Sequence, residues 1–202
     1  GTLPPNRSPG SRISCVWARF YNDARVLARM LSEWAQQQRA SQREGFVLCS
    51  GGGPGIMETC NRGARDAGGH SVGLNISLPH EQDPNPYITE EPNVEFHCFF
   101  MRKLWFVQMA VGLVVFPVGF GTLDELAEVL TLIQTGRSQP MPIIVYGSEF
   151  WDDVIDFDAL LHWGTISPED LGLFHRCDTP EEAFACLKEH LVPLLEEDSV
   201  SG

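Results

Sequence analysis

The chain has 202 residues, of which 43% are apolar, and this is enough for the core of one compact domain. Acidic residues number 27 against 14 lysines and arginines, and the formal charge of −13 argues against a protein that wraps nucleic acid or coats an anionic membrane. Any phosphate group that the chain binds is therefore expected to be small, and to be held locally by backbone N–H groups and a few arginines.

The six cysteines include no Cys-x-x-Cys pair, and several of them lie in apolar runs. Such usage is typical of buried free thiols in a reducing compartment rather than of disulfides or a zinc site. The six histidines do not fall at metal-ligand spacing either, so no metal site is expected. The sequence contains no apolar run of transmembrane length and no signal-peptide pattern, which favours a cytoplasmic protein.

The first part of the chain predicts a leader, a strand and a helix. Residues 1–11 are rich in Pro, Gly and Ser and are expected to be flexible, ahead of a single domain over residues 12–195 and an acidic tail over residues 196–202. Residues 13–17 are apolar and predict a first strand, and apolar residues at helical spacing predict a helix over residues 22–38. The connection between this strand and this helix would be unusually short for a parallel fold, so residues are expected to be missing directly after the first strand.

Strands and helices alternate through the rest of the chain. Further strands are predicted over residues 46–49, 71–78, 94–98, 111–117, 142–146 and 174–177. Helices are predicted over residues 54–67, 99–110, 122–136 and 149–162, followed by a last helix that a capping box of Thr179 and Glu182 opens. This alternation predicts an α/β fold with a doubly wound parallel sheet that has helices on both faces.

Two glycine-rich turns each join a predicted strand to a helix. The first is Gly51-Gly-Gly-Pro-Gly55 and the second is Gly119-Phe-Gly-Thr122. In a doubly wound sheet ligands bind at the carboxyl ends of the strands, where helix N-termini attract anions. The two turns together therefore predict a nucleotide-like phosphate site. Neither turn is a Walker A loop, and neither has the G-x-G-x-x-G pattern followed by a ribose-binding acid.

Three charged residues near these turns are candidates for the site. The guanidinium of Arg102 suits a phosphate, although the alternative is an arginine that is only solvated or paired with a surface carboxylate. Glu125 is either a catalytic carboxylate or the second member of a capping box with Thr122, which would only start the helix. Glu58 lies near a helix N-terminus, where a carboxylate is favourable without any further role.

These motifs, in this combination and order, resemble the LOG ("lonely guy") family of cytokinin riboside 5′-monophosphate phosphoribohydrolases, long labelled lysine decarboxylases. The resemblance runs from about Ile13 to Leu194 and is carried by Gly51–Glu58, Asn61–Ala64, Met101–Lys103 and Pro117–Glu125. It implies a Rossmann-like fold, a homodimer or larger homo-oligomer, and no cofactor. The implied activity is hydrolysis of the N-glycosidic bond of an adenosine-type 5′-monophosphate, either AMP or a cytokinin riboside monophosphate, to free base and ribose 5-phosphate.

The resemblance also implies roles for individual residues. Arg102 and Glu125 occupy the catalytic positions. The implied substrate-binding residues are Gly52, Gly53, Glu58, Met101, Lys103, Gly119, Gly121 and Thr122. Glycosidic cleavage passes through an oxocarbenium-like centre, which a carboxylate can stabilise while it orients or deprotonates water. Arg102 either holds the phosphate or steadies the departing base, and sequence does not choose between the two.

Two departures from the family pattern keep a rival function open. Val118 replaces the first glycine of the second motif, and the family's small Gly/Ser turn after the first strand is absent between Trp17 and Phe20. Val118 favours a non-catalytic nucleotide-binding or cofactor-carrier protein, whereas the candidate catalytic pair opposes it. A decarboxylase would need a Schiff-base lysine, for which Lys103 is the only credible candidate. The missing ribose-binding acid weakens an NAD-dependent oxidoreductase.

Overall fold

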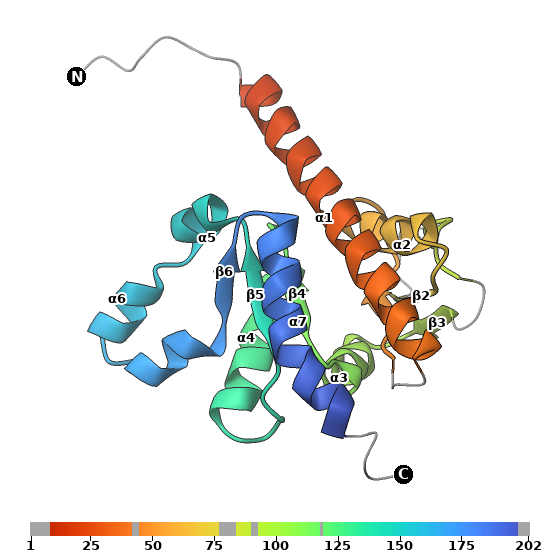
Figure 1. Ribbon diagram of the computed structural model, residues 1–202. Helices are drawn as coiled ribbons and strands as arrows, with labels where there is room; N and C mark the ends of the chain where they lie inside the picture. The colour runs from red at the N-terminus through yellow and green to blue at the C-terminus, as the bar shows by residue number, and fades with distance from the viewer. Residues whose placement is uncertain (1–8, 42–44, 77–83, 90–92, 118, 198–202) are drawn as a thin grey trace.

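The computed structural model describes residues 9–41, 45–76, 84–89, 93–117 and 119–197, and shows an α/β protein (Figure 1). Its strands form two three-stranded sheets in the orders β1-β2-β3 and β4-β5-β6, and every pair is parallel. The strands are β1 (Leu48–Ser50), β2 (Ser71–Ile76), β3 (Asn93–Phe96), β4 (Leu113–Val115), β5 (Ile143–Tyr146) and β6 (His175–Cys177). The predicted fold class is confirmed, with the strands divided between two sheets.

The helices fill the connections between the strands. They are α1 (Pro9–Ala40), α2 (Ile56–Asp66), α3 (Phe99–Met109), α4 (Phe120–Gln134), α5 (Ser148–Val154), α6 (Phe157–His162), the 3-10 helix η1 (Pro168–Leu173) and α7 (Pro180–Glu197). Among the described residues, no helix combines the length and apolar character needed to cross a bilayer. The predicted capping box is present at α7, where the Glu182 N–H donates to Thr179 Oγ1 and the Thr179 N–H donates to Glu182 Oε2.

The strand predicted over residues 13–17 is wrong, because this segment is part of α1. The helix runs without a break from Pro9 to Ala40, so the expected gap in the chain is wrong as well. Val16 and Trp17 are exposed, which shows that the apolar run is not a buried strand. Among the side chains of this helix that the structure describes, from Val16 onward, the first buried one is Phe20, at the helical spacing visible farther along the chain.

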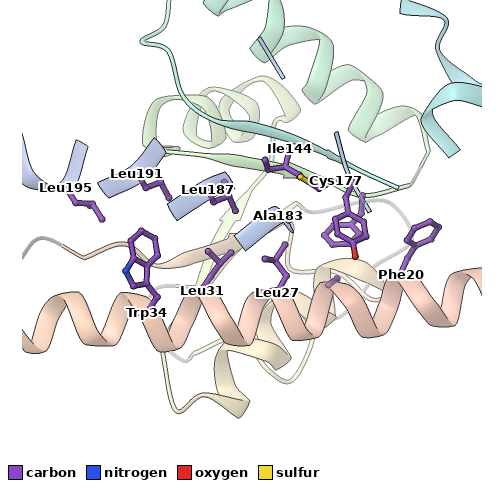
Figure 2. Close-up of a cluster of buried hydrophobic side chains, with 13 residues drawn as sticks. Phe20, Leu27, Leu31, Trp34, Ile144, Cys177, Ala183, Leu187, Leu191 and Leu195 are labelled. Carbon is purple, nitrogen blue, oxygen red and sulfur yellow. The ribbon is translucent and has the colours of Figure 1, made fainter. Parts of the chain in front are cut away.

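Helix α1 organises the larger of the two apolar cores. It lies against α2 on one side and α7 on the other (Figure 1). Figure 2 shows side chains of α1 packed toward α7 and the second sheet. The buried side chains of this core include Phe20, Leu27, Leu31 and Trp34 of α1, Ile144 of β5, Cys177 of β6, and Ala183, Leu187, Leu191 and Leu195 of α7.

Strand β5 is buried on both faces, as its unbroken apolar sequence predicts. Ile144 and Tyr146 face the core that contains α1 and α7, whereas Ile143 and Val145 face a second core with α4 and α5. This alternation follows from the two-residue period of a strand. Helices therefore cover both faces of the second sheet.

The helix predicted over residues 149–162 is two shorter helices, α5 and α6. Ile155 has an extended backbone, with φ of −133°, and ends α5. Asp156 then caps α6 by accepting a 2.8 Å hydrogen bond from the Ala159 N–H. Aspartate is a favoured N-cap, so its carboxylate supplies the local reason for a new helix start.

Candidate active site

The structure brings Arg102 and Glu125 together from two different helices. Arg102 lies in the first turn of α3, and Glu125 lies in the second turn of α4. The distance from Arg102 Nη2 to Glu125 Oε1 is 4.0 Å, and the two side chains are 13% and 32% exposed. Arg102 is therefore mostly buried and faces a carboxylate, so it is not simply a solvated surface arginine.

Burial is the main influence on the ionisation of Glu125. It raises the pKa of the carboxyl above its ordinary value, and the neighbouring Arg102 opposes this change. Asp124 and Glu128 add to the rise because each is a like charge. A carboxyl whose pKa is raised by desolvation, beside one specific cation, is typical of catalytic acids and bases.

The first glycine turn lies directly against Arg102. A Cβ atom added to Gly51 would stand 2.4 Å from Arg102 Nη2 and 2.5 Å from Met57 Sδ, so only glycine leaves room for the guanidinium. The guanidinium carbon lies 5.3 Å from the ring centre of Phe106. Within the described residues, Nε of Arg102 is buried and has no hydrogen-bond partner. Because buried charged donors are normally paired, this N–H is a donor suited to a bound ligand.

The capping-box interpretation of Thr122 and Glu125 is wrong. Helix α4 begins at Phe120, two residues earlier than predicted, and its N-cap is Gly119 with no side-chain cap hydrogen bond. Thr122 lies inside the first turn, where its N–H donates to the Gly119 carbonyl at 3.2 Å. Glu125 is therefore free of a capping role and faces Arg102.

The second glycine turn is open to solvent. Gly119 and Gly121 are exposed, and a Cβ added to either would meet no atom within 4 Å. The backbone N–H groups at the start of α4 can therefore be approached by an anion. Val118, the departure from the family pattern, lies outside the described residues.

Lys103 joins α3 to α4 and is not available as a free cation. Its ammonium lies 2.8 Å from Asp124 Oδ2 and 3.0 Å from Glu128 Oε2. Hydrogen bonds to these two carboxylates raise the pKa of Lys103. A lysine held protonated in this way is poorly suited to form a Schiff base, because that step needs the neutral amine. Met101, beside it on α3, is exposed.

Glu58 lies at the contact between α1 and α2. Its Oε1 accepts a 3.3 Å hydrogen bond from the hydroxyl of Tyr21 on α1. The same hydroxyl accepts a 3.4 Å bond from Nη1 of Arg62. Glu58 thus has a structural partner of its own, in addition to its predicted role in substrate binding.

A buried polar network shapes the first glycine turn, and sequence reasoning did not identify it. Asn85 Nδ2 donates to the carbonyl of Gly52 at 3.0 Å and to Asn61 Oδ1 at 2.9 Å. Ser50 Oγ donates to Asn61 Oδ1 at 2.7 Å and accepts from the Gly52 N–H at 3.1 Å. Gly52 itself has a φ of 75°, a left-handed conformation that glycine adopts readily and other residues do not. The available signal was the presence of asparagine on the buried face of α2.

An open cavity that neither Arg102 nor Glu125 lines does not suit a phosphate. It has a volume of about 620 Å³ and is lined by Asp152, Ile155, Asp156, Phe157, Asp158, Leu171, Phe174 and Arg176. Three of these residues are aspartates, and Arg176 is paired with Asp152. A negatively charged lining repels an anionic ligand, so the Arg102–Glu125 region remains the candidate site.

Comparison with known proteins finds relatives that match over a large part of the chain. A family model described as "possible lysine decarboxylase" matches residues 57–187. The probable cytokinin riboside 5′-monophosphate phosphoribohydrolase LOGL5 of Oryza sativa is 27% identical over 160 residues, covering 77% of this chain and 63% of that protein. The pyrimidine/purine nucleotide 5′-monophosphate nucleosidase of Escherichia coli K12 is 32% identical over 115 residues, covering 50% of this chain and 24% of that protein. The chain thus spans less than two thirds of either relative.

Solved structures show the same fold. The X-ray structure of TM1055 has a TM-score of 0.59 at 23% identity, covering 93% of this chain and 94% of that one. The molybdenum cofactor carrier protein of Chlamydomonas reinhardtii has a TM-score of 0.52 at 22% identity, covering 85% of this chain and 89% of that one. At these identities the likeness concerns the fold alone.

Proposed function

This chain belongs to the LOG family, and from that premise we propose that it hydrolyses the N-glycosidic bond of an adenosine-type 5′-monophosphate to free base and ribose 5-phosphate. The observation that carries the proposal is the Arg102–Glu125 pair. A carboxylate and a guanidinium lie 4.0 Å apart, mostly buried, beside two glycine turns. The relatives named as phosphoribohydrolase and as nucleotide nucleosidase act on the same class of bond.

Different parts of the proposed site have different chemical roles. The 5′-phosphate binds at the exposed start of α4, where Gly119 and Gly121 offer backbone N–H groups and Thr122 lines the same turn. Glu125 stabilises the oxocarbenium-like centre and orients or deprotonates the attacking water. Arg102 favours the ionised form of Glu125 and offers its unpartnered Nε–H to the substrate. The mechanism needs no metal or organic cofactor.

Release of free base is the measurement that tests this function. The protein is incubated with AMP and, separately, with isopentenyladenosine monophosphate, and the free base is measured by chromatography. Replacing Glu125 with glutamine keeps its size but removes the carboxylate, so we expect a loss of about 10²-fold to 10⁴-fold in turnover. Asp124→Asn is the matched control, because Asp124 is a neighbouring but exposed carboxylate that pairs with Lys103. Asp124→Asn is expected to keep most of the activity.

Binding without cleavage would support the alternative function. If the wild-type protein binds AMP tightly and releases no base, the chain is a nucleotide-binding or carrier protein. A carrier role is the one named for the structural neighbour from Chlamydomonas reinhardtii. The geometry of Arg102 and Glu125 opposes this alternative, because simple phosphate binding gives no reason to bury a carboxylate beside the guanidinium.

The exposed apolar surface around α3 supports self-association. Phe99, Phe100, Met101, Leu104, Trp105, Met109, Val111 and Phe120 are all large apolar residues with at least 40% of their surface exposed. The bond between Lys103 and Asp124 shows that α3 and the start of α4 are neighbours. Monomers rarely expose a large contiguous apolar patch. A second copy of the chain is the proposed partner, and it would cover the helices that carry Arg102 and Glu125.

The proposed location is the cytoplasm. Cys49, Cys60, Cys98, Cys177 and Cys186 are free cysteines in the described part of the chain. Burial raises the pKa of the Cys60 thiol to about 12. Unpaired thiols of this kind are typical of proteins in a reducing compartment.

A further inference from the structure

Two histidines and a cysteine that are distant in the sequence meet where β6 packs against α7. His175 is the first residue of β6, whereas Cys186 and His190 lie one turn apart on α7. One nitrogen or sulfur atom from each of the three lies within 4.8 Å of the others. The rings of His175 and His190 have centroids 4.8 Å apart. The sequence expectation that the histidines form no metal site was based on their spacing along the chain. Such spacing does not reveal that His175 on β6 lies beside Cys186 and His190 on α7.

The donor set suits a particular class of metal. Two imidazole nitrogens and one thiolate are preferred ligands of Zn²⁺, which binds nitrogen at about 2.0 Å and sulfur at about 2.3 Å in a tetrahedral arrangement. Those bond lengths place ligand atoms about 3.5 Å from one another. Side-chain movements of about 1 Å, within the reach of rotamer adjustment, would close the 4.8 Å arrangement around one ion.

A second contact orients one of the histidines. His190 Nδ1 lies 2.8 Å from the carbonyl oxygen of Cys186, so this nitrogen carries the proton and donates it. Nδ1 also lies 4.0 Å from Cys186 Sγ, and metal binding through Nε2 would leave its hydrogen bond to the carbonyl in place. Histidines that bind metals commonly donate their second N–H to a carbonyl or carboxylate, which fixes the ring orientation.

The surrounding charge is compatible with a bound cation. Glu189, one residue before His190 on α7, carries a carboxylate that offers negative charge to an arriving cation, and the whole chain carries a formal charge of −13.

We propose that His175, Cys186 and His190 bind one Zn²⁺ ion and thereby fasten β6 to α7. Binding replaces the thiol proton of Cys186 with a sulfur–zinc bond and releases that proton to solvent. The fourth position is taken by water. Because α7 contributes Ala183, Leu187 and Leu191 to the core that α1 and β5 share, the ion would stabilise the folded chain.

Metal titration of the full chain tests the site. The protein is freed of metal, and Zn²⁺ is added in competition with a chromophoric chelator, with one equivalent expected to bind. Cys186→Ser and His190→Ala are each expected to weaken binding by at least about tenfold, since each removes a direct ligand. Cys98→Ser and His162→Ala are matched controls, because both residues are exposed and lie outside the cluster. Both controls should bind as the wild type does.

Cobalt and thermal unfolding separate a true site from loose binding. Co²⁺ at the site should give a thiolate-to-cobalt charge-transfer band that is missing in Cys186→Ser. Zn²⁺ should raise the melting temperature of the wild type and leave that of Cys186→Ser unchanged. His190 is exposed, so His190→Ala is expected to fold, and circular dichroism checks this. Equal zinc affinity in the wild type and both cluster variants, or a cobalt spectrum without the thiolate band, would overturn the proposal.

Discussion

Two opposing influences set the pKa of the Glu125 carboxyl, and their balance decides how readily this group ionises. Burial makes the ionised carboxylate costly, while Arg102 at 4.0 Å makes it more favourable. Burial outweighs the arginine, since the pKa lies above its ordinary value. The folded protein therefore destabilises the very form that the proposed mechanism requires, as is common where a side chain serves function rather than stability.

This balance predicts a variant that loses activity and gains stability. Because folding raises the pKa of Glu125, its favourable contribution is present at low pH, where the group is protonated in both states. That contribution is lost as the pH rises through the folded-state pKa. Glu125→Gln resembles the protonated form, so it should unfold at a higher denaturant concentration than the wild type near pH 7. The two proteins should be similar near pH 4.

The same pKa governs the pH dependence of turnover. Base release by the wild type should fall as the pH drops through the raised pKa of Glu125, because protonation removes the carboxylate.

For the predicted stability of Glu125→Gln, Asp153→Asn is the control. It changes an exposed carboxylate and should shift the free energy of unfolding by no more than about 0.5 kcal/mol at either pH. A Glu125→Gln protein that is less stable than the wild type at neutral pH would show that the ion pair outweighs burial, contrary to this account.

At the scale of elements, α1 shows why one strand prediction failed while the first glycine turn lies between a strand and a helix as predicted. Residues 13–17 are only five residues, four of them apolar, a length at which strand and helix cannot be distinguished by pattern. The sequence contains no Gly or Pro from residue 12 to residue 44, so nothing stops a helix from continuing through this segment. The glycine turns, in contrast, directly follow β1 and β4, although α4 begins at Phe120 and so takes in most of the second turn.

The candidate site was predictable to the extent that it depends on local sequence. Glycine turns after parallel strands predict where a ligand binds, so Arg102 and Glu125 were expected at the same edge. The network of Ser50, Asn61 and Asn85 was not predictable in the same way. Its hydrogen bonds join α2 to a segment 24 residues farther along the chain. Such contacts depend on tertiary packing, which residue spacing does not encode.

The contact between the first glycine turn and α3 predicts the effect of Gly51→Ala. The new Cβ would meet Arg102 Nη2 and Met57 Sδ, which are the ends of flexible side chains rather than backbone atoms. These side chains can move, so the melting temperature should change little, but Arg102 is displaced from Glu125. We therefore expect base release to fall by at least about tenfold, since a displacement of about 1 Å at a catalytic group can cost up to 10²-fold.

A glycine elsewhere provides the matched control for this change. Gly172 in η1 has open space where a Cβ would be added, so Gly172→Ala should alter neither activity nor melting temperature. Kinetics with AMP and thermal unfolding of both variants give the comparison. Full activity in Gly51→Ala would mean that the position of Arg102 against the turn is unimportant, and would count against its proposed role.

At the scale of the whole molecule, elements that follow both sheets contribute residues to the candidate site. Gly51 follows β1 in the first sheet, whereas Glu125 lies on the helix that follows β4 in the second. Helix α1 holds the two halves together, because its Trp34 contacts Phe46 before β1 and Phe184 on α7. The geometry of the candidate pair Arg102 and Glu125 therefore depends on packing between elements that follow both sheets.

Self-association is the last property that belongs to this scale, and Phe100→Glu tests it. Phe100 is 66% exposed on α3, so a glutamate there should leave the fold intact while placing a charge in the proposed interface. Light scattering after size-exclusion chromatography should show at least twice the mass of one chain for the wild type, and the mass of one chain for the variant. Trp163→Glu is the matched control, because Trp163 is 79% exposed after α6, outside the patch around α3. Its replacement should leave the mass unchanged.

The Phe100→Glu variant should also release less base than the wild type, since the patch surrounds the helix that carries Arg102. A wild-type protein that stays a single chain at high concentration would contradict the proposed interface without affecting the proposed chemistry.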